Sequence, residues 1–511
     1  MAKSNRRWWS AIALITLAGL ALRLYSLLTE SIFLDEVSLH WLVSDRSFSS
    51  MLDEVKATEN SPVLGFSLAW AAAKIGSSPD WIRLPAMVAG VITIPLTALL
   101  GLRSVGRRAG LIAAGFAAVS PLLVFFSIEA RPYALGCMFT TLTALLLLEL
   151  TSAGSQNRSR NIVGALWPIA AAAAMLSHYT AIFAIAAAAL WVLLTHPAAR
   201  LRVLLGSVGA AVIFSAVWLG PFLTQYSHSD VQVKFTKFIA PLTPKTLWEM
   251  SATLISGRPI VGLARVPGFP LGVVIAACLL VAVGAVALRI ASLQAGERLR
   301  ICAKTLKSPV GMLVVIVIAA PVGLIVSGIL ADGSFLLARN EIYALPPLLV
   351  LIASALGLLS KRLAYGTGIA LCAALAGASL IGIADWQRPD SHSAASAIAA
   401  RWQPGDIVIE QTFSPNTAND GDINSYLNGS IASSFRFARM SKRTDAETTI
   451  ADGFAEALQN GSSVFVTAAD TVPQPRPAGP PTDLADRFRL VWQRQLTGTG
   501  RLTVSEWQPV R

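Results

Sequence analysis

The sequence predicts a polytopic α-helical membrane protein with a separate water-soluble α/β domain at its C-terminal end. Of the 511 residues, 54% are hydrophobic and only 14% are charged, which excludes both an ordinary soluble protein and a disordered chain. Apolar runs of about 18 or more residues, long enough to cross a hydrocarbon core, recur as far as Asp385. Residues 386–511 instead have ordinary polar content and short alternating segments. We therefore expect a membrane domain over residues 1–385 and an α/β domain over residues 386–511.

Charge and cysteine positions fit a membrane topology. The net charge of +12 could suggest a nucleic-acid partner, but the Arg and Lys residues stand mainly in short clusters between apolar spans, as they do in cytoplasmic loops. We therefore expect a lipid bilayer as a partner and no nucleic acid. The 4 cysteines lie in or beside apolar spans, so there is no disulfide framework or zinc-binding spacing. The first apolar run has no small-residue cleavage site, so we expect a retained helix.

The positive-inside rule orders the apolar spans. With the N-terminal basic cluster in the cytoplasm, the first span leads to a first outer loop at residues 29–61. The apolar run at residues 62–76 is short and contains Lys74, so we expect an interfacial helix there instead of a crossing. Basic loops then fall inside throughout, with the C-terminal domain outside. The result is about eleven transmembrane helices, at residues 8–28, 82–102, 109–126, 133–151, 162–177, 180–195, 203–221, 268–288, 309–330, 343–360 and 364–384.

The first outer loop carries two adjacent carboxylates, Asp35 and Glu36, a few residues after the first span. Acids beside a membrane helix are costly to place near apolar surface, so they are candidates for function. The alternative is that they are solvated acids at the water boundary.

The same topology brings further polar residues to the outer ends of spans and to outer loops. Three of them are arginines that break the positive-inside rule at separate places. A guanidinium offers a fixed fork of donors that suits phosphate oxygens, so these arginines suggest an anionic ligand. The alternative is that each pairs with a nearby acid or with lipid headgroups. The arginines are Arg83, Arg131 and Arg339, and the other residues are Asn60, Glu129, Tyr133, His178 and Tyr179.

Three of these residues have competing interpretations. His178 could bind a divalent metal ion together with carboxylates, but a lone histidine at a helix end is more often only hydrogen-bonded. A metal ion is therefore an open possibility, with His178 as the candidate ligand. Tyr133 and Tyr179 could line a sugar pocket, but aromatic residues are also common at the membrane interface.

The C-terminal domain shows an α/β pattern. A helix is expected at residues 394–402, and a strand follows Pro404-Gly405 at residues 406–410. A second strand is expected at residues 463–468, a late β pair at 490–496 and 502–507, and an exposed loop at 470–482. The domain has no glycine-rich phosphate loop, pair of catalytic acids or Cys/His site. Recognition or support is therefore expected of it rather than chemistry.

Four ordered motifs resemble the bacterial members of the GT-C superfamily of integral-membrane glycosyltransferases, which includes the protein O-mannosyltransferases and the lipid A aminoarabinose transferases. Phe33-Leu34-Asp35-Glu36 resembles the Asp-Glu motif of that family, and Asp80-Trp81-Ile82-Arg83-Leu84-Pro85 resembles its arginine-bearing start of the following helix. Glu129-Ala130-Arg131-Pro132-Tyr133-Ala134-Leu135 resembles its Glu-Ala-Arg-x-Tyr-Ala-Leu run, followed by His178-Tyr179. Arg339 to Pro347 resembles its Arg-Tyr-x-x-Pro segment.

Two departures from the family pattern bear on the site. The first outer loop ends in Asn60-Ser61-Pro62 where the family often has His-Pro-Pro, so contacts to the acceptor or to a metal ion differ there. Glu341-Ile342 separates Arg339 from Tyr343, which makes Arg339 the weakest of the three arginine assignments.

The resemblance implies sugar transfer from a polyprenyl-phosphate-linked donor to an acceptor outside the cytoplasmic membrane, with inversion as the usual outcome. The acceptor would be a cell-envelope glycan, a lipid or a protein, and the enzyme a hexosyl- or pentosyltransferase of a bacterial inner membrane. Asp35 would act as general base, and Arg83, Arg131 and Arg339 would stabilise the phosphate leaving group. Glu36 and Glu129 would orient the acceptor or hold the arginines.

Two other functional classes remain open at this point. A transporter or flippase of lipid-linked sugars would also need many helices and an arginine site, but such proteins tend to have internal repeats and a site near the bilayer midplane, and the sequence has neither feature. A noncatalytic scaffold would tolerate replacement of Asp35 and Arg131.

Overall fold

The chain divides into two compact units. The computed structural model describes residues 2–32, 35–44, 46–76, 78–152, 157–227, 242–257, 269–331, 333–385, 390–412, 423–427, 429–439, 443–469, 479–496 and 502–510. Unit 1 comprises Met1–Tyr25, Ser47–Ala69 and Arg83–Gly382, and unit 2 comprises Ser26–Arg46, Trp70–Ile82 and Ile383–Arg511. The first outer loop contributes to both units. The domain ranges 1–385 and 386–511 stay a prediction.

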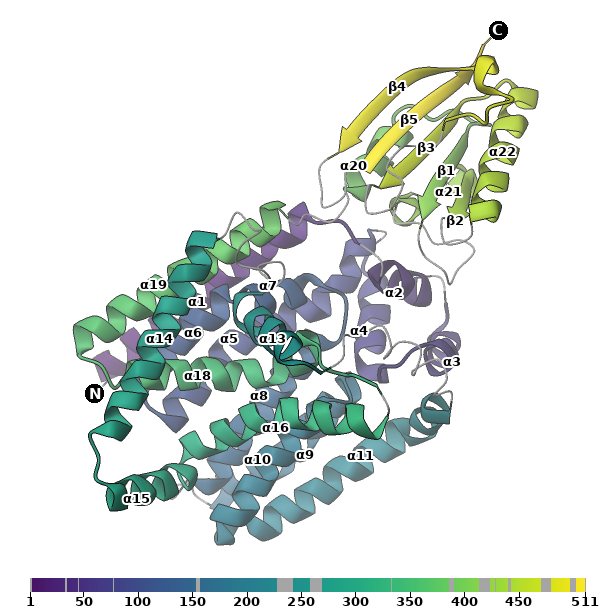
Figure 1. Cartoon of the computed structure of the whole chain (residues 1–511). Helices are drawn as coiled ribbons and strands as arrows, with labels where there is room; N and C mark the ends of the chain where they lie inside the picture. The colour runs from purple at the N-terminus through teal and green to yellow at the C-terminus, as the bar shows by residue number, and fades with distance from the viewer. Residues whose placement is uncertain are drawn as a thin grey trace. The chain divides into compact units, whose positions relative to one another are not determined.

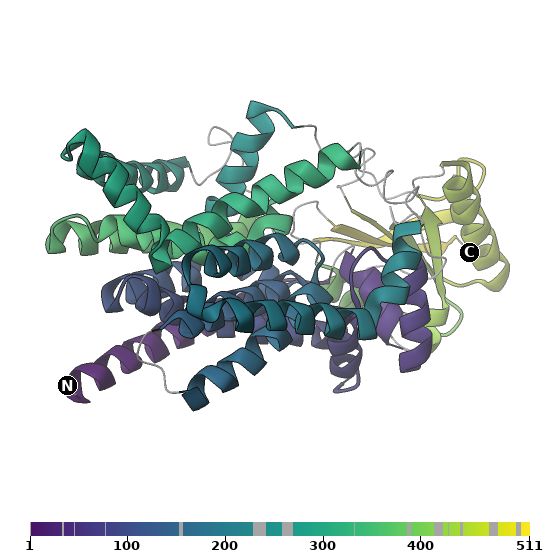
Figure 2. The same cartoon turned by 90° about the horizontal axis from the view of Figure 1, so that it is seen from below.

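Unit 1 is a bundle of helices (Figures 1 and 2). Most of α1 (Ala2–Thr29), α4 (Val63–Ala73) and α19 (Lys361–Asp385) belongs to it. Its other helices are α3 (Phe48–Thr58), α5 (Leu84–Ser104), α6 (Arg107–Val119), α7 (Pro121–Ile128), α8 (Tyr133–Thr151), α9 (Asn157–Ser177), α10 (Ala181–Thr195), α11 (Arg200–Ser227), α13 (Pro244–Ser256), α14 (Phe269–Ala291), α15 (Ala295–Leu306), α16 (Pro309–Leu330), α17 (Ala338–Glu341) and α18 (Leu345–Leu356).

Small residues let the helices of unit 1 pack closely. Helix α5 packs against α6 and α8, α8 against α9, and α6 against α18. Ala113, Ala114 and Ala117 of α6 are completely buried. A Cβ atom on Gly101 of α5 would lie 2.8 Å from the Cα atom of Gly110 on α6. Close packing of this kind stabilises helix association inside a lipid bilayer, where the hydrophobic effect does not drive helices together.

The predicted spans correspond to helices of unit 1, but three of these helices are short or bent. Among the described residues, 8 helices are long and apolar enough to cross a membrane, or 9 if one bent pair is a single span. The three other predicted crossings do not form single long helices. Residues 109–126 form the bent pair α6 and α7. Residues 180–195 form α10, which has 15 residues, and residues 343–360 contain α18, which has only 12 residues. Hydropathy measures the length of an apolar run, but it does not reveal where the helix within that run breaks.

The bend between α6 and α7 lies at Ser120 and Pro121. Ser120 has an extended backbone with φ −60° and ψ 121°, and Pro121 is the first residue of α7. A proline disfavours the helical conformation at the residue before it and supplies no N–H to the preceding turn. The two helices therefore meet at 53°, and α7 carries the chain to Glu129 and Arg131 in a new direction.

Unit 2 contains the start of the first outer loop and a five-stranded sheet. The predicted polar loop folds into helix here, with Asp35 and Glu36 in the first turn of α2 (Asp35–Val43). The strands are β1 (Ile407–Thr412), β2 (Phe435–Arg439), β3 (Val464–Ala469), β4 (Phe488–Leu496) and β5 (Leu502–Pro509), in the order β2-β1-β3-β5-β4. Strand β1 is parallel to β2 and β3, and β5 is antiparallel to β3 and β4.

Helices cover both faces of this sheet (Figure 1). Val408 packs in one core with α20 (Ser391–Ala399), whereas its neighbours Ile407 and Ile409 pack in the other core with α22 (Arg443–Asn460). This alternation follows the two-residue period of a strand. The predicted helix at 394–402 and the strands at 406–410, 463–468, 490–496 and 502–507 are confirmed within a few residues. Strand β2 and helix α22 were not predicted, and most of the loop predicted at 470–482 lies outside the described residues.

Candidate active site

Four of the predicted site residues lie together at one end of unit 1. The ring of Tyr133 lies 5.3 Å from the ring of His178, measured between centroids. The guanidinium carbon of Arg339 lies 5.9 Å from the centroid of the Tyr133 ring. Arg131 and Arg339 both act electrostatically on His178. We call Arg131, Tyr133, His178 and Arg339 the arginine cluster.

Turns between helices position the arginine cluster. Helix α7 ends at Ile128, the N–H of Arg131 donates to the Glu129 carbonyl at 2.7 Å, and Pro132 caps the start of α8. This tight turn places Arg131 just before Tyr133, the first residue of α8. His178 lies in the turn after α9, and Arg339 lies in the short helix α17. Two turns and a short helix from distant parts of the chain therefore meet.

His178 is neutral in this environment. Burial and the positive charges of Arg131 and Arg339 together lower the pKa of His178 to about 3. Its Nδ1 atom lies 2.8 Å from the Thr180 hydroxyl, which donates to the carbonyl of Asn340 at 3.2 Å. This pair of contacts fixes the ring orientation and links the turn after α9 to α17.

The residues around His178 do not fit a divalent metal ion. Two nearby arginines disfavour a cation at this histidine. Among the described residues, no three His, Cys, Asp or Glu side chains are grouped closely enough to hold a metal ion. The same charges instead favour an anion.

Arg131 also forms an ion pair that the sequence analysis did not identify. Its Nη1 atom lies 3.6 Å from Oε2 of Glu59, and the two side chains are 14% and 15% exposed. Glu59 directly precedes Asn60, which is exposed in the turn before α4. Glu59 therefore orients Arg131 and connects the first outer loop to the arginine cluster. Its only signal in the sequence is that position beside Asn60.

The side chain of Tyr179 has different partners from that of His178. Its hydroxyl donates to Oε1 of Gln225 at 2.6 Å and accepts from the Trp218 indole at 2.9 Å. The Gln225 amide in turn donates to the carbonyls of Val55 at 3.1 Å and Ser61 at 3.4 Å. Tyr179 therefore supports the backbone on both sides of Glu59 and Asn60. This geometry favours a positioning role over the sugar-pocket role.

Glu341 is a second residue that the sequence analysis did not assign to the site. It is 2% exposed, and its Oε1 atom has no hydrogen-bond partner among the residues that the structure describes. Burial raises the pKa of Glu341 to about 7. Glu341 ends α17, two residues after Arg339, so a carboxyl that carries a proton near neutral pH stands beside the cluster.

Arg83 lies at the same end of unit 1. It is completely buried at the start of α5. Ala86 and Ala89 of α5 pack against Ala134 and Leu135 of α8, so the N-terminal ends of the two helices lie side by side.

Arg23 supports the bend that carries Glu129 and Arg131. This arginine of α1 is completely buried. Its guanidinium donates to the Ser127 hydroxyl at 2.9 Å, to the carbonyls of Ala118 at 2.9 Å and Ala117 at 3.3 Å, and to Gly19 of its own helix at 3.0 Å. Ala117 and Ala118 stand at the end of α6, where carbonyls lose their helical partners. The signal for Arg23 in the sequence is a charge inside the first apolar run.

Asp35 and Glu36 belong to unit 2. Asp35 is exposed, whereas Glu36 is 1% exposed. The C-terminal domain holds the segment just before them: the N–H of Ile32 donates to the Tyr426 hydroxyl at 2.8 Å, and the N–H of His392 donates to the Ser31 hydroxyl at 3.1 Å. The supporting role expected of that domain stays a prediction. Phe33 and Leu34 lie outside the described residues.

Comparison with known proteins agrees with this architecture. Residues 60–220 match the model of a family described as dolichyl-phosphate-mannose-protein mannosyltransferase. No curated protein matches the chain by sequence. The chain is similar in structure to ArnT from Cupriavidus metallidurans bound to undecaprenyl phosphate, with a TM-score of 0.57 and 12% identity over 97% of each chain.

Two further solved structures are similar. The apo state of the same ArnT gives a TM-score of 0.56 and 12% identity over 99% of this chain and 98% of that chain. The oligosaccharyltransferase of Archaeoglobus fulgidus in the apo form gives a TM-score of 0.48 and 12% identity over 90% of this chain and 69% of that chain. The matches to the two ArnT structures cover nearly the whole chain. The family match covers Arg131, Tyr133 and His178 of the arginine cluster. The chain therefore has the fold of the GT-C superfamily of integral-membrane glycosyltransferases, as the resemblance of its motifs predicts.

Proposed function

We propose that the protein transfers a sugar from a polyprenyl-phosphate-linked donor to an acceptor outside the cytoplasmic membrane. The observation that carries the proposal is the arginine cluster, in which two arginines from distant segments surround a neutral histidine. The likeness to a protein bound to undecaprenyl phosphate supports a polyprenyl-phosphate donor. The family match supports glycosyl transfer. The acceptor would be a cell-envelope glycan, a lipid or a protein.

The arginine cluster suits the chemistry of the leaving group. When the bond between the sugar and the phosphate breaks, negative charge grows on the phosphate oxygens. Arg131 and Arg339 would stabilise that charge more strongly in the transition state than in the ground state. Glu59 holds Arg131 in place before the donor arrives, which lowers the cost of ordering the side chain during the reaction. Arg83 would be the third phosphate ligand.

Asp35 would supply the base. An acceptor hydroxyl must lose its proton as it attacks the anomeric carbon, and a carboxylate within hydrogen-bond reach can take that proton. Asp35 is exposed at the start of α2, so an acceptor can reach it. Attack by the acceptor from the side opposite the phosphate would invert the anomeric centre. Glu36 and Glu129 would orient the acceptor or the arginines, and Asn60, Tyr133 and His178 would contact the substrates.

The proposal includes a location. The enzyme would reside in a bacterial inner membrane with its N-terminus in the cytoplasm and its reaction on the other face. The long apolar helices agree with a multi-pass membrane protein. The assignment of the N-terminus to the cytoplasm and of the reaction to the opposite face rests on the distribution of Arg and Lys residues.

Transfer of labelled sugar tests the proposal. Membranes that contain the wild type, Asp35→Asn or Asp53→Asn receive a panel of radiolabelled polyprenyl-phosphate sugars and an extract of the host envelope. Asp53 is a second exposed acid of the first outer loop, so it is the matched control. We expect one donor to be consumed by the wild type and by Asp53→Asn, with label in an acceptor, and no transfer by Asp35→Asn. If labelled lipid instead changes leaflet equally in all three without transfer, the protein is a transporter of lipid-linked sugars.

A further inference from the structure

A basic cavity lies at the end of α5 that is remote from Arg83. It has a volume of about 410 Å³ and is lined by the turn between α5 and α6 and by the turn between α18 and α19. Helix α5 has 21 residues, so at 1.5 Å per residue about 30 Å separates its two ends. That length is close to the thickness of a hydrocarbon core. The cavity therefore lies a membrane thickness away from the candidate active site.

The charges that line the cavity have one sign. Its lining includes Arg107, Arg108 and Lys361, and none of its described lining residues is acidic. Within the described parts of the chain, no carboxylate lies within ion-pair distance of Arg108 or Lys361. The nearby Arg103 differs, because its guanidinium pairs with Glu149. Like charges gathered around one hollow repel each other unless an anion lies between them.

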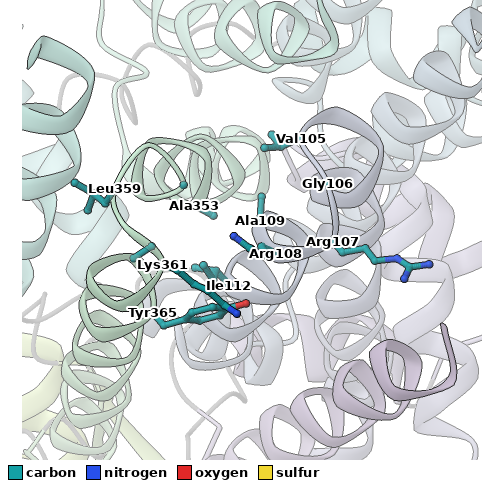
Figure 3. Close-up of a pocket in the computed structure, with 12 residues that line it drawn as sticks. Val105, Gly106, Arg107, Arg108, Ala109, Ile112, Ala353, Leu359, Lys361 and Tyr365 are labelled. Carbon is teal, nitrogen blue, oxygen red and sulfur yellow. The ribbon is translucent and has the colours of Figure 1, made fainter. Parts of the chain in front are cut away.

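The side chains converge on the hollow. Figure 3 shows Arg108, Lys361 and Tyr365 pointing toward one another, whereas Arg107 points away. Lys361 is the first residue of α19, and Arg107 and Arg108 open α6. The N–H groups at the two helix starts add partial positive charge to that of the side chains.

The rest of the lining is apolar and continues onto an apolar surface. Ala109, Ile112, Ala353 and Leu359 line the cavity. Close by, Val105 is 43% exposed, Leu358 52% and Leu363 51%, as side chains that face lipid tails are. A ligand of this hollow would thus contact cations with one part and hydrocarbon with another, which a free inorganic anion cannot do.

We propose that this cavity binds the phosphate headgroup of an anionic membrane phospholipid. Arg108 and Lys361 contact the phosphate, Tyr365 donates a hydrogen bond to it, and the acyl chains leave over Val105 and Leu363. Basic pockets between helices at the membrane surface are suited to such headgroups. The bound lipid holds the α5–α6 turn against the α18–α19 turn and is not consumed by the reaction.

Lipid binding by the purified full-length protein tests this site. The protein in neutral detergent is titrated with radiolabelled phosphatidylglycerol, and retained lipid is counted after gel filtration. We compare the wild type with Arg108→Gln/Lys361→Gln. The control is Arg289→Gln/Lys304→Gln, because both of its residues are exposed cations outside the cavity lining. We expect at least about tenfold weaker binding in the cavity variant and unchanged binding in the control. The charge-preserving variant Arg108→Lys/Lys361→Arg should bind within about threefold of the wild type.

Three outcomes would overturn the proposal. Equal retention of phosphatidylglycerol by the wild type and the cavity variant would show that the lipid binds elsewhere. Full displacement of the lipid by millimolar inorganic phosphate, with phosphate alone bound as tightly, would identify a site for a soluble anion. Phosphatidylcholine is titrated in the same way as a zwitterionic comparison. If it binds as tightly as phosphatidylglycerol, the net charge of the lipid has no role, and the proposal of an anionic lipid is wrong. The binding readout does not depend on sugar transfer, so it is independent of the proposed function.

Discussion

The burial of Glu341 predicts how the stability of the protein changes with pH. The carboxyl is 2% exposed, and burial raises its pKa from 4.5 to about 7. A group whose pKa is raised by folding favours the folded state while it is protonated. Its contribution is therefore complete below pH 4.5 and is lost as the pH rises through about 7. A glutamine at this position keeps a neutral side chain of the same shape at every pH.

The size of the effect follows from the shift. A pKa difference of about 2.5 corresponds to about 3 kcal/mol of unfolding free energy between the two pH limits, at 1.36 kcal/mol per pKa unit. We expect Glu341→Gln to be more stable than the wild type at pH 8.5 and nearly equal to it at pH 5. The difference at pH 8.5 should approach about 3 kcal/mol, because only the wild type must bury a charge there.

Thermal unfolding in detergent, followed by tryptophan fluorescence at pH 5 and pH 8.5, measures this difference. Glu249→Gln is the control, because that side chain is 42% exposed and lies beside Lys245. We expect its unfolding midpoint to change little between the two pH values relative to the wild type. A Glu341→Gln variant that is less stable than the wild type at pH 8.5 would refute the reasoning, since it would mean that the carboxylate has a partner in the folded protein.

Three further substitutions test the support of the site. Gly90→Ala should cost about 1–3 kcal/mol of stability, measured by thermal unfolding, because the added Cβ would collide with the Ser127 hydroxyl. Tyr179→Phe should lower the unfolding free energy by about 1–3 kcal/mol and leave the KM for donor sugar unchanged, because its hydroxyl bonds Gln225 rather than substrate. Tyr426→Phe should lower the rate of transfer at saturating substrate, since the N–H of Ile32 loses its partner just before α2.

Each of these substitutions has an outcome that would contradict it. Gly220→Ala is the control for Gly90→Ala, because no described atom outside the helix lies within 4 Å of a Cβ atom at Gly220. Equal midpoints for the two alanine variants would contradict the packing argument. A raised KM with unchanged stability in Tyr179→Phe would restore the sugar-pocket interpretation. Wild-type transfer by Tyr426→Phe would show that this hydrogen bond does not position α2.

The sequence predicts the positions of the helices, and which residues gather at one end of unit 1, better than it predicts the contacts within the site. Hydropathy identifies the long spans because apolar length is a property of the chain itself. Motifs at span ends correctly place Arg131, Tyr133, His178 and Arg339 in one region, because the alternation of spans sorts residues by side. The break at Pro121 lies inside an apolar run, so a hydropathy profile alone does not separate α6 from α7.

The residues that the sequence analysis missed act through tertiary contacts. Glu59 and Glu341 are acids without a distinctive local pattern, and only folding brings Glu59 to Arg131 and buries Glu341. Arg23 has a local signal, a charge inside an apolar helix, but its partners on α6 and α7 are visible only in the structure. The short strand β2 was missed because five residues carry little periodicity.

We propose that Arg131 and Arg339 stabilise the phosphate leaving group. The most direct test is the rate of transfer by the purified protein with a saturating polyprenyl-phosphate sugar, compared among the wild type, Arg131→Gln and Arg339→Gln. We predict a loss of about 100-fold or more in kcat for Arg131→Gln, a smaller loss for Arg339→Gln, and wild-type unfolding midpoints in both. A kcat within about twofold of the wild type for both folded variants would contradict the account, because removal of a transition-state contact must slow the chemical step.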